Sequence, residues 1–130
     1  MGSRQILIAA KAAIQVPTRW TQGCLARDLL GCPCSTNSTG AEQFSILGAI
    51  DRAARLSRDF DGADEAYRAV ANVLALKLGH PLPRKELGYK VAIELLNAFN
   101  DIATHASVLQ LLDNVIERTD DLSPQLSSTR

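Results

Sequence analysis

Apolar residues recur every three or four positions through most of this chain, and that spacing constrains its fold more than any other feature. It is the spacing of one buried face of an α-helix, whereas a half-buried strand alternates at every second residue. The steps are regular from Leu87 through Val91 and Leu95 to Phe99. We therefore predict a mainly α protein, a single-domain bundle of about five helices. The predicted helices cover residues 4–15, 41–58, 62–79, 84–99 and 104–118.

The stretch between the first two predicted helices does not follow this spacing. Gly23, Gly31, Pro33 and Gly40 fall within it, and both residue types favour turns. We predict a small β-hairpin or an irregular loop inserted after the first helix, with a turn near residues 28–31.

Three residues in or beside the helices carry more specific expectations. Gly48 lies inside the second predicted helix, where glycine costs roughly 1 kcal/mol relative to alanine. A close contact with another backbone would explain it, and the hairpin is the expected neighbour. Asp61 is placed to cap the third helix, and Gly79 is placed to end it.

The length of 130 residues fits one domain, which at this size folds without a metal or a disulfide. We place a single helical domain at residues 1–119. Residues 120–130 contain a proline and several hydroxyl side chains, and we predict a disordered tail there.

Charge and hydropathy argue against several classes of protein. The 14 Lys and Arg residues balance the 14 Asp and Glu residues, so the chain has no net attraction to nucleic acid or anionic membrane. Lys11 interrupts the apolar N-terminal run, and no apolar stretch reaches the roughly 18 residues of a membrane span. We expect no nucleic-acid partner and no membrane association. The odd count of three cysteines favours a reducing compartment, and the expected location is the cytoplasm.

The cysteines raise two chemical alternatives. Cys24, Cys32 and Cys34 could bind zinc together with His80 or His105, or Cys24 could act as a nucleophile with His105 as base. The spacing is not that of the paired cysteines typical of structural zinc, and no signature flanks Cys24. Phosphate-binding glycine loops and metalloprotease motifs are also missing from the sequence. We therefore favour free thiols, expect no metal or cofactor, and consider a non-enzymatic role better supported than an enzymatic one.

Polar residues gather between the last two predicted helices, in "FNDIATH". Asn100 can end one helix, and Thr104 can cap the next, with His105 as the first helical residue. The same side chains, with Asp101, could instead form a reactive or binding site. The residues alone favour the capping interpretation.

Three sequence blocks together resemble a known family. They are "WTQGCLARD" from Trp20, "FSILGAIDRA" from Phe44, and "FNDIATH" from Phe99, followed by "VLQLLD". The pattern is similar to that of a family of small uncharacterised bacterial proteins, common in actinobacteria and their phages and described as a domain of unknown function. This chain has Ser45 where the family pattern has Cys and Phe99 where it has Trp. Both positions would then serve core packing.

The resemblance implies that the first and last blocks lie close together. Opposite charges offer a physical reason, since Arg27 or Asp28 could pair with Asp101 or His105. Such a cluster would be either a structural clasp or the floor of a pocket. Its candidate residues are Trp20, Gln22, Arg27, Asp28, Asn100, Asp101 and His105.

The leading functional hypothesis is a protein-interaction or regulatory module of phage or mobile-element origin, which binds an unidentified protein partner or forms a homo-oligomer. The alternative is a small enzyme or small-ligand-binding protein that uses the polar cluster of segments 20–28 and 100–105.

Overall fold

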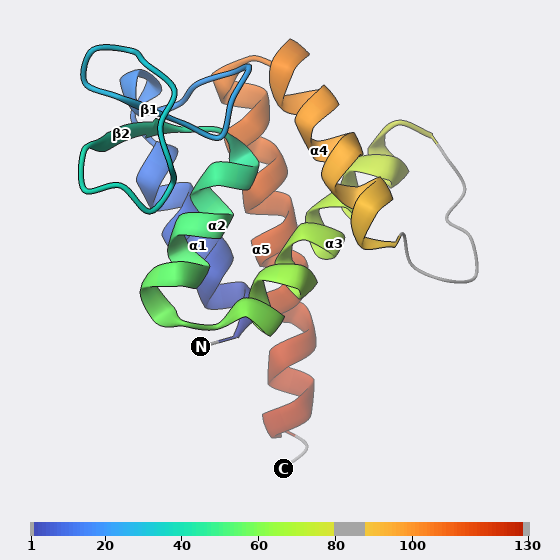
Figure 1. The fold of residues 1–130 in the computed structure, drawn as a ribbon. Coiled ribbons are helices and arrows are strands. Elements are labelled where there is room, and N and C mark those ends of the chain that lie inside the picture. Colours follow the sequence, from blue (N-terminus) through green and yellow to red (C-terminus); the bar gives the residue numbers. More distant parts are fainter. Residues whose placement is uncertain (1, 80–87, 129–130) are drawn as a thin grey trace.

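The computed structural model describes residues 2–79 and 88–128 of the chain, with side chains up to residue 119. It confirms the mainly α bundle with a small hairpin inserted after the first helix (Figure 1). The helices are α1 (Ser3–Ile14), α2 (Ile46–Ser57), α3 (Phe60–Lys77), α4 (Tyr89–Ile102) and α5 (His105–Ser128). A short 3-10 helix, η1 (Pro17–Arg19), and two strands, β1 (Ala26–Asp28) and β2 (Ala41–Phe44), lie between α1 and α2.

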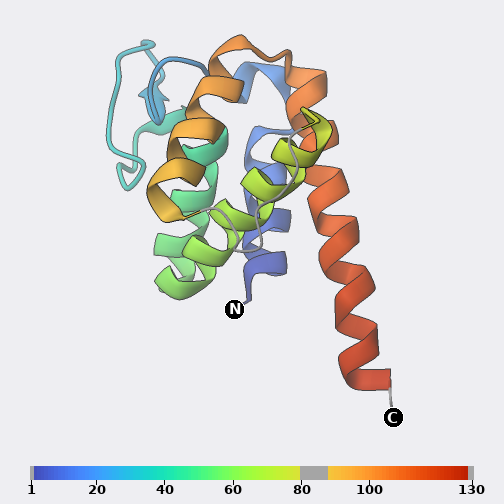
Figure 2. The same cartoon turned by 90° about the vertical axis from the view of Figure 1, so that its right-hand side faces the viewer.

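Helix α3 is central to the bundle because it packs against α1, α2, α4 and α5. Side chains from every helix meet in one core, for example Ile6, Ile50, Leu74, Leu96 and Leu112, all of which are buried. The residues between α1 and α2, which we call the insert, lie on one side of this bundle, and α5 lies on the other (Figure 2). No helix in residues 2–79 and 88–128 combines the length and the apolar character needed to cross a bilayer.

The strands of the insert pair antiparallel, with Ala26 opposite Phe44 and Asp28 opposite Ala41. The predicted turn is present, since the Gly31 N–H donates to the Asp28 carbonyl at 2.9 Å. The prediction of a helix from residue 41 was wrong. Residues 41–44 instead form strand β2, because their backbone pairs with β1. Helix α2 begins only after Ser45, whose hydroxyl accepts from the N–H of Gly48.

The expectation for Gly48 is confirmed. A Cβ at this position would lie 1.9 Å from the Leu25 carbonyl oxygen, immediately before β1. Gly79 has φ +81°, as a glycine that ends a helix should. The capping assignment at Asp61 was wrong, because α3 begins at Phe60 and the cap must precede it. Asp59 is the cap, and its carboxylate accepts from the N–H of Gly62 at 2.9 Å.

The helical spacing of apolar residues also predicts that Leu78 and Val91 face inward, and both predictions were wrong. Leu78 follows the end of α3 and is 56% exposed, and Val91 on α4 is 51% exposed. The buried face of α4 is instead offset by one residue, and it runs through Ala92, Leu96 and Asn100. Leu87, which was also expected to face inward, lies outside the described residues.

The backbone of α5 continues to Ser128, beyond residue 119 where the sequence placed the end of the domain. The division into a domain at 1–119 and a tail at 120–130 stays a prediction.

Candidate functional site

Asn100 lies at the centre of the polar cluster, buried on α4 with only 1% of its surface exposed. Its amide oxygen accepts from Trp20 Nε1 at 2.9 Å and from the Ile46 N–H at 3.1 Å. Its amide nitrogen donates to the Thr21 carbonyl at 3.0 Å. A single side chain therefore joins α4 to the insert and to the start of α2. The prediction that Asn100 ends its helix was wrong, since α4 continues to Ile102.

Gln22 and Gly23 extend these contacts to the end of α4. Gln22 Nε2 donates to the carbonyls of Asn100 at 2.9 Å and Ala103 at 3.2 Å. The last carbonyls of a helix lack partners within the helix, so the amide of Gln22 satisfies groups that would otherwise need water. The Gly23 N–H donates to Asp101 Oδ1 at 2.9 Å.

We call the contacts of Trp20, Thr21, Gln22 and Gly23 with Asn100, Asp101 and Ala103 the clasp. They join positions about 80 residues apart in the sequence. In Figure 1 the chain after α1 accordingly reaches the junction of α4 and α5. The two blocks that the family resemblance placed together do meet.

His105 is the first residue of α5 and lies beside the clasp. Its Nε2 donates to the Ile14 carbonyl at 2.7 Å, at the C-terminus of α1. The imidazole therefore carries a proton on Nε2. Its ring centroid lies 5.8 Å from that of Trp20, with the planes tilted by 50°. Thr104 caps α5 as predicted, because its hydroxyl accepts from the Ser107 N–H at 3.1 Å.

Arg27 and Asp28 make no ion pair with Asp101 or His105 in the described part of the chain, so that predicted pairing was wrong. The guanidinium of Arg27 bonds within the insert instead. It donates to the Thr21 hydroxyl at 2.8 Å and to the carbonyls of Gly31 at 3.0 Å and Gln22 at 3.1 Å. These oxygens lie within six residues of Arg27 in the sequence. The local turn therefore supplies acceptors for all three donor nitrogens, and Arg27 needs no distant carboxylate.

Asp28 organises the turn that follows β1. One carboxylate oxygen accepts from the N–H groups of Leu30 and Cys32, each at 3.0 Å. Gly31 adopts φ +85°, which closes the turn at little steric cost. Leu29 and Leu30 stand at its end, 82% and 86% exposed, and we call these two leucines the tip. The tip was not among the predicted site residues, although two adjacent leucines in a turn are an unusual composition.

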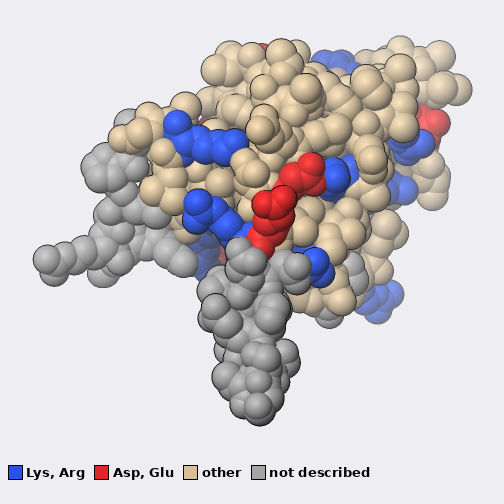
Figure 3. Space-filling view, turned by 180° about the vertical axis from the view of Figure 1, so that it is seen from behind, with Lys and Arg blue, Asp and Glu red and all other residues tan. Residues whose placement is uncertain are grey.

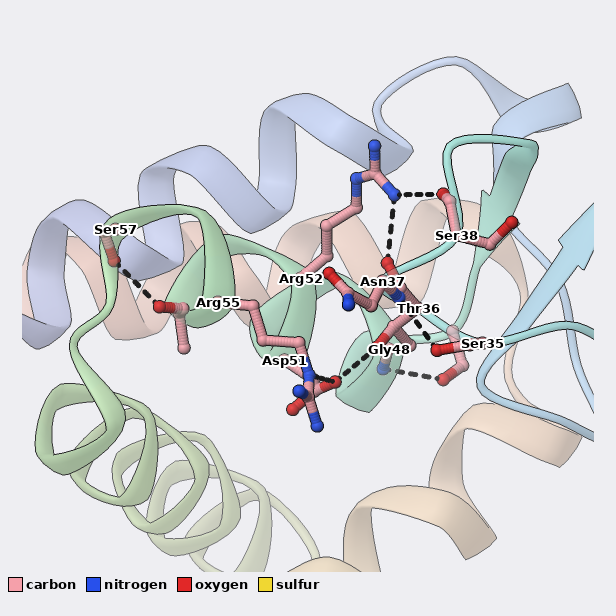
Figure 4. A network of polar contacts seen from close by, with 11 residues as sticks. Ser35, Thr36, Asn37, Ser38, Gly48, Asp51, Arg52, Arg55 and Ser57 are labelled. Carbon is pink, nitrogen blue, oxygen red and sulfur yellow. Dashed lines mark hydrogen bonds and ion pairs between the residues drawn. The ribbon is translucent and has the colours of Figure 1, made fainter.

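The longer loop between the strands is anchored to α2 through a second polar network (Figure 4). The buried Thr36 hydroxyl donates to Asp51, which also accepts from Arg55 Nε at 2.9 Å. Arg52 Nη1 donates to the carbonyls of Thr36 at 2.9 Å and Ser38 at 3.0 Å. Helix α2 therefore provides both a carboxylate and a guanidinium that hold this loop.

Two neighbouring hollows open between the insert and α4, and both are lined by Leu25 and Asn97. The smaller, of about 230 Å³, is also lined by Gly23, Cys24, Ser45 and Asp101. The larger, of about 320 Å³, is also lined by Leu47, Asp51, Arg55, Tyr67, Tyr89 and Ile93. Of the seven candidate residues, Asp101 alone is among these linings. None of the residues that line the larger hollow was predicted as a site residue from the sequence.

The thiols of Cys24, Cys32 and Cys34 are free. The described residues contain no group of three or more His, Cys, Asp or Glu side chains arranged to hold a metal ion, and His80 lies outside them. Burial, followed by the negative charge of Asp28, raises the pKa of Cys34. That thiol is therefore a poorer metal ligand and nucleophile than an ordinary cysteine at neutral pH.

Fold and contacts together define a small helical-bundle protein with a β-hairpin insert fastened across the α4–α5 junction. The sequence model of a family of unknown function (DUF6197) matches residues 2–118, and the chain belongs to this family. The predicted membership of a domain of unknown function is thereby confirmed. Comparison with curated proteins and with solved structures gave no match.

Proposed function

We propose that this protein is an interaction module that inserts the tip into an apolar cleft of a partner protein. The exposure of Leu29 and Leu30 at 82% and 86% carries this proposal. Fully burying one leucine side chain contributes roughly 1.5–3 kcal/mol, so two adjacent leucines can anchor an interface. Exposed turns are usually occupied by polar residues, glycine or proline.

The turn that carries the tip is well ordered by its hydrogen bonds. The side chains of Arg27 and Asp28 each form hydrogen bonds with the backbone of the turn. The clasp joins the base of the insert to α4. An anchor that is already fixed before binding loses less conformational entropy in the complex. In this proposal the predicted polar residues act by positioning the apolar tip.

Charge supports a protein partner over a nucleic acid. On the face seen in Figure 3, basic and acidic side chains are interspersed and much of the surface is uncharged. Nucleic-acid binding typically uses a continuous basic patch. A second copy of this chain is a further possible partner, which a measurement of molecular mass in solution would reveal.

A cytoplasmic location accompanies this proposal, supported by the three free thiols. A bacterial origin linked to phages or mobile elements is proposed on the sequence resemblance alone.

The alternative function, an enzymatic or ligand-binding site at segments 20–28 and 100–105, is less well supported. The polar groups of Asn100 and the donors of Arg27 are bonded to other parts of the chain. Binding a ligand there would require breaking these bonds.

The test compares the proteins captured from the native host by the wild-type chain and by a Leu29→Ser/Leu30→Ser double variant. Leu56→Ser is the matched control, because Leu56 is also an exposed leucine, at 75%, but lies on α2. We expect a partner that the double variant loses and the control keeps. Equal capture by all three chains would refute the proposal.

A further inference from the structure

The larger hollow is bounded by α2, α3 and α4 and closed on one side by Leu25 of the insert. Its volume of about 320 Å³ lies at the lower end of the range for small-molecule sites, roughly 300–1,000 Å³. Leu25, Leu47 and Ile93 provide apolar walls. It is separate from the tip, and none of the four clasp residues at the base of the insert, Trp20 to Gly23, lines it.

Tyr67 contributes a polar group that lacks a protein partner. The residue as a whole is 7% exposed. Among the described residues its hydroxyl has no hydrogen-bond partner, and the side chain lines the hollow. The hydroxyl oxygen is not itself buried, so it can reach a ligand in the hollow and donate a hydrogen bond to it. Tyr89, which is 55% exposed, lies edge-on to Tyr67 with ring centroids 6.0 Å apart. A flat apolar group can pack against the Tyr89 ring.

Arg55 supplies a second set of available donors. Its Nε bonds to Asp51 at 2.9 Å, while its two terminal nitrogens make no hydrogen bond within the described residues. A guanidinium presents paired N–H groups that match the two oxygens of a carboxylate. Asp51 already accepts from Thr36 and Arg55, so its charge is compensated within the protein.

We propose that this hollow binds a small organic acid, a carboxylate attached to an aromatic or aliphatic body. The carboxylate accepts hydrogen bonds from the terminal nitrogens of Arg55 and from the Tyr67 hydroxyl. The body packs between Leu25, Ile93 and the ring of Tyr89. Because the site has no net charge, recognition depends on these directed hydrogen bonds more than on long-range attraction.

The state of Tyr67 agrees with the donor role. Burial raises its pKa above the ordinary value for tyrosine, and the nearby Asp51 raises it further. The phenol therefore keeps its proton across the physiological range and can donate it to a carboxylate.

Titration with phenylacetate, benzoate and hexanoate, followed by two-dimensional NMR, tests the proposal. We expect saturable shifts at Tyr67, Tyr89, Ile93 and Asn97 with at least one acid. Phenylacetamide, which has the same body without the charge, is expected to bind at least about tenfold more weakly than phenylacetate.

Variants then assign the contacts. Arg55→Gln is expected to weaken binding by about tenfold or more, and Tyr67→Phe by about threefold or more. Arg58→Gln is the matched control, since Arg58 is an exposed arginine at the end of the same helix and does not line the hollow. The spectrum of each variant shows whether it is folded. The tip double variant should bind the acids normally.

Three results would overturn the proposal. They are the absence of saturable shifts with all three acids, shifts confined to residues away from the hollow, or unchanged affinity in folded Arg55→Gln.

Discussion

The base and the end of the insert have different roles. The base holds the insert to the helical bundle, and the end presents apolar side chains to solvent. At the base, the Asn100 amide and the Gln22 amide bond to partners far away in the sequence. At the end, Leu29 and Leu30 leave most of their apolar surface in water. The polar cluster has the composition of a reactive site, yet its groups bond to one another. The leucines belong to an ordinary turn, yet they are the side chains left for a partner.

Gly48→Ala should produce the largest loss of stability among variants at the base. The added Cβ would meet the Leu25 carbonyl oxygen at 1.9 Å, so the insert and α2 must separate. We expect the free energy of unfolding to fall by about 3 kcal/mol, measured by urea denaturation. Gly40→Ala is the control, because the nearest atom to its Cβ is a side-chain oxygen at 3.7 Å. Similar losses of unfolding free energy for both variants would show that there is room for a Cβ between residue 48 and the Leu25 carbonyl.

Asn100→Ala should have the next largest effect. It leaves the Trp20 indole N–H and the Ile46 N–H without their acceptor and removes the donor to Thr21. A buried polar group without a partner costs about 1–3 kcal/mol, and we expect a total loss of about 2–3 kcal/mol. Asn97→Ala on the exposed side of α4 should change stability by less than about 0.5 kcal/mol. A small effect at Asn100 would mean that the clasp contributes little to folding.

His105→Phe should have a smaller effect of about 1 kcal/mol. An aromatic ring remains beside Trp20, but the donor to the Ile14 carbonyl is lost. Thermal denaturation beside Gln110→Ala, an exposed position on the same helix, measures the difference. If His105→Phe is as stable as the wild-type chain, the hydrogen bond from His105 to the Ile14 carbonyl does not contribute to stability, because water can replace it.

The Leu29→Ser/Leu30→Ser double variant should have the smallest effect on folding. Both side chains are exposed, so we expect the unfolding free energy to change by less than about 0.5 kcal/mol in urea. A loss above 1 kcal/mol would show that the tip packs against its own chain in solution.

The sequence predicted best where a local rule applies to buried residues. Helical spacing located all five helices, and a glycine within a helix indicated the close approach of the insert to α2. The prediction failed at residues 41–44, where the buried Phe44 fits a strand and a helix equally well until its partner strand is known.

The candidate site shows the same limit. Trp20 and Gln22 were predicted correctly as neighbours of Asn100. The partners of Arg27 could not be predicted, since its choice between a carboxylate and nearby carbonyls depends on the turn geometry. The hollow lined by Tyr67 and Arg55 could not be recognised as a sequence motif, because its residues come from separate helices.

The central claim is that the clasp holds the insert while the tip binds the partner, and one comparison tests it directly. Trp20→Phe removes the indole donor to Asn100 but leaves the tip unchanged, whereas the tip double variant leaves the clasp unchanged. The affinity of each purified chain for the captured partner would be measured by calorimetry, at a temperature where both are folded. We predict that Trp20→Phe lowers the unfolding temperature but binds within about threefold of wild type, and that the tip variant loses at least about a hundredfold. Tight binding by the tip variant together with lost binding by folded Trp20→Phe would contradict the account.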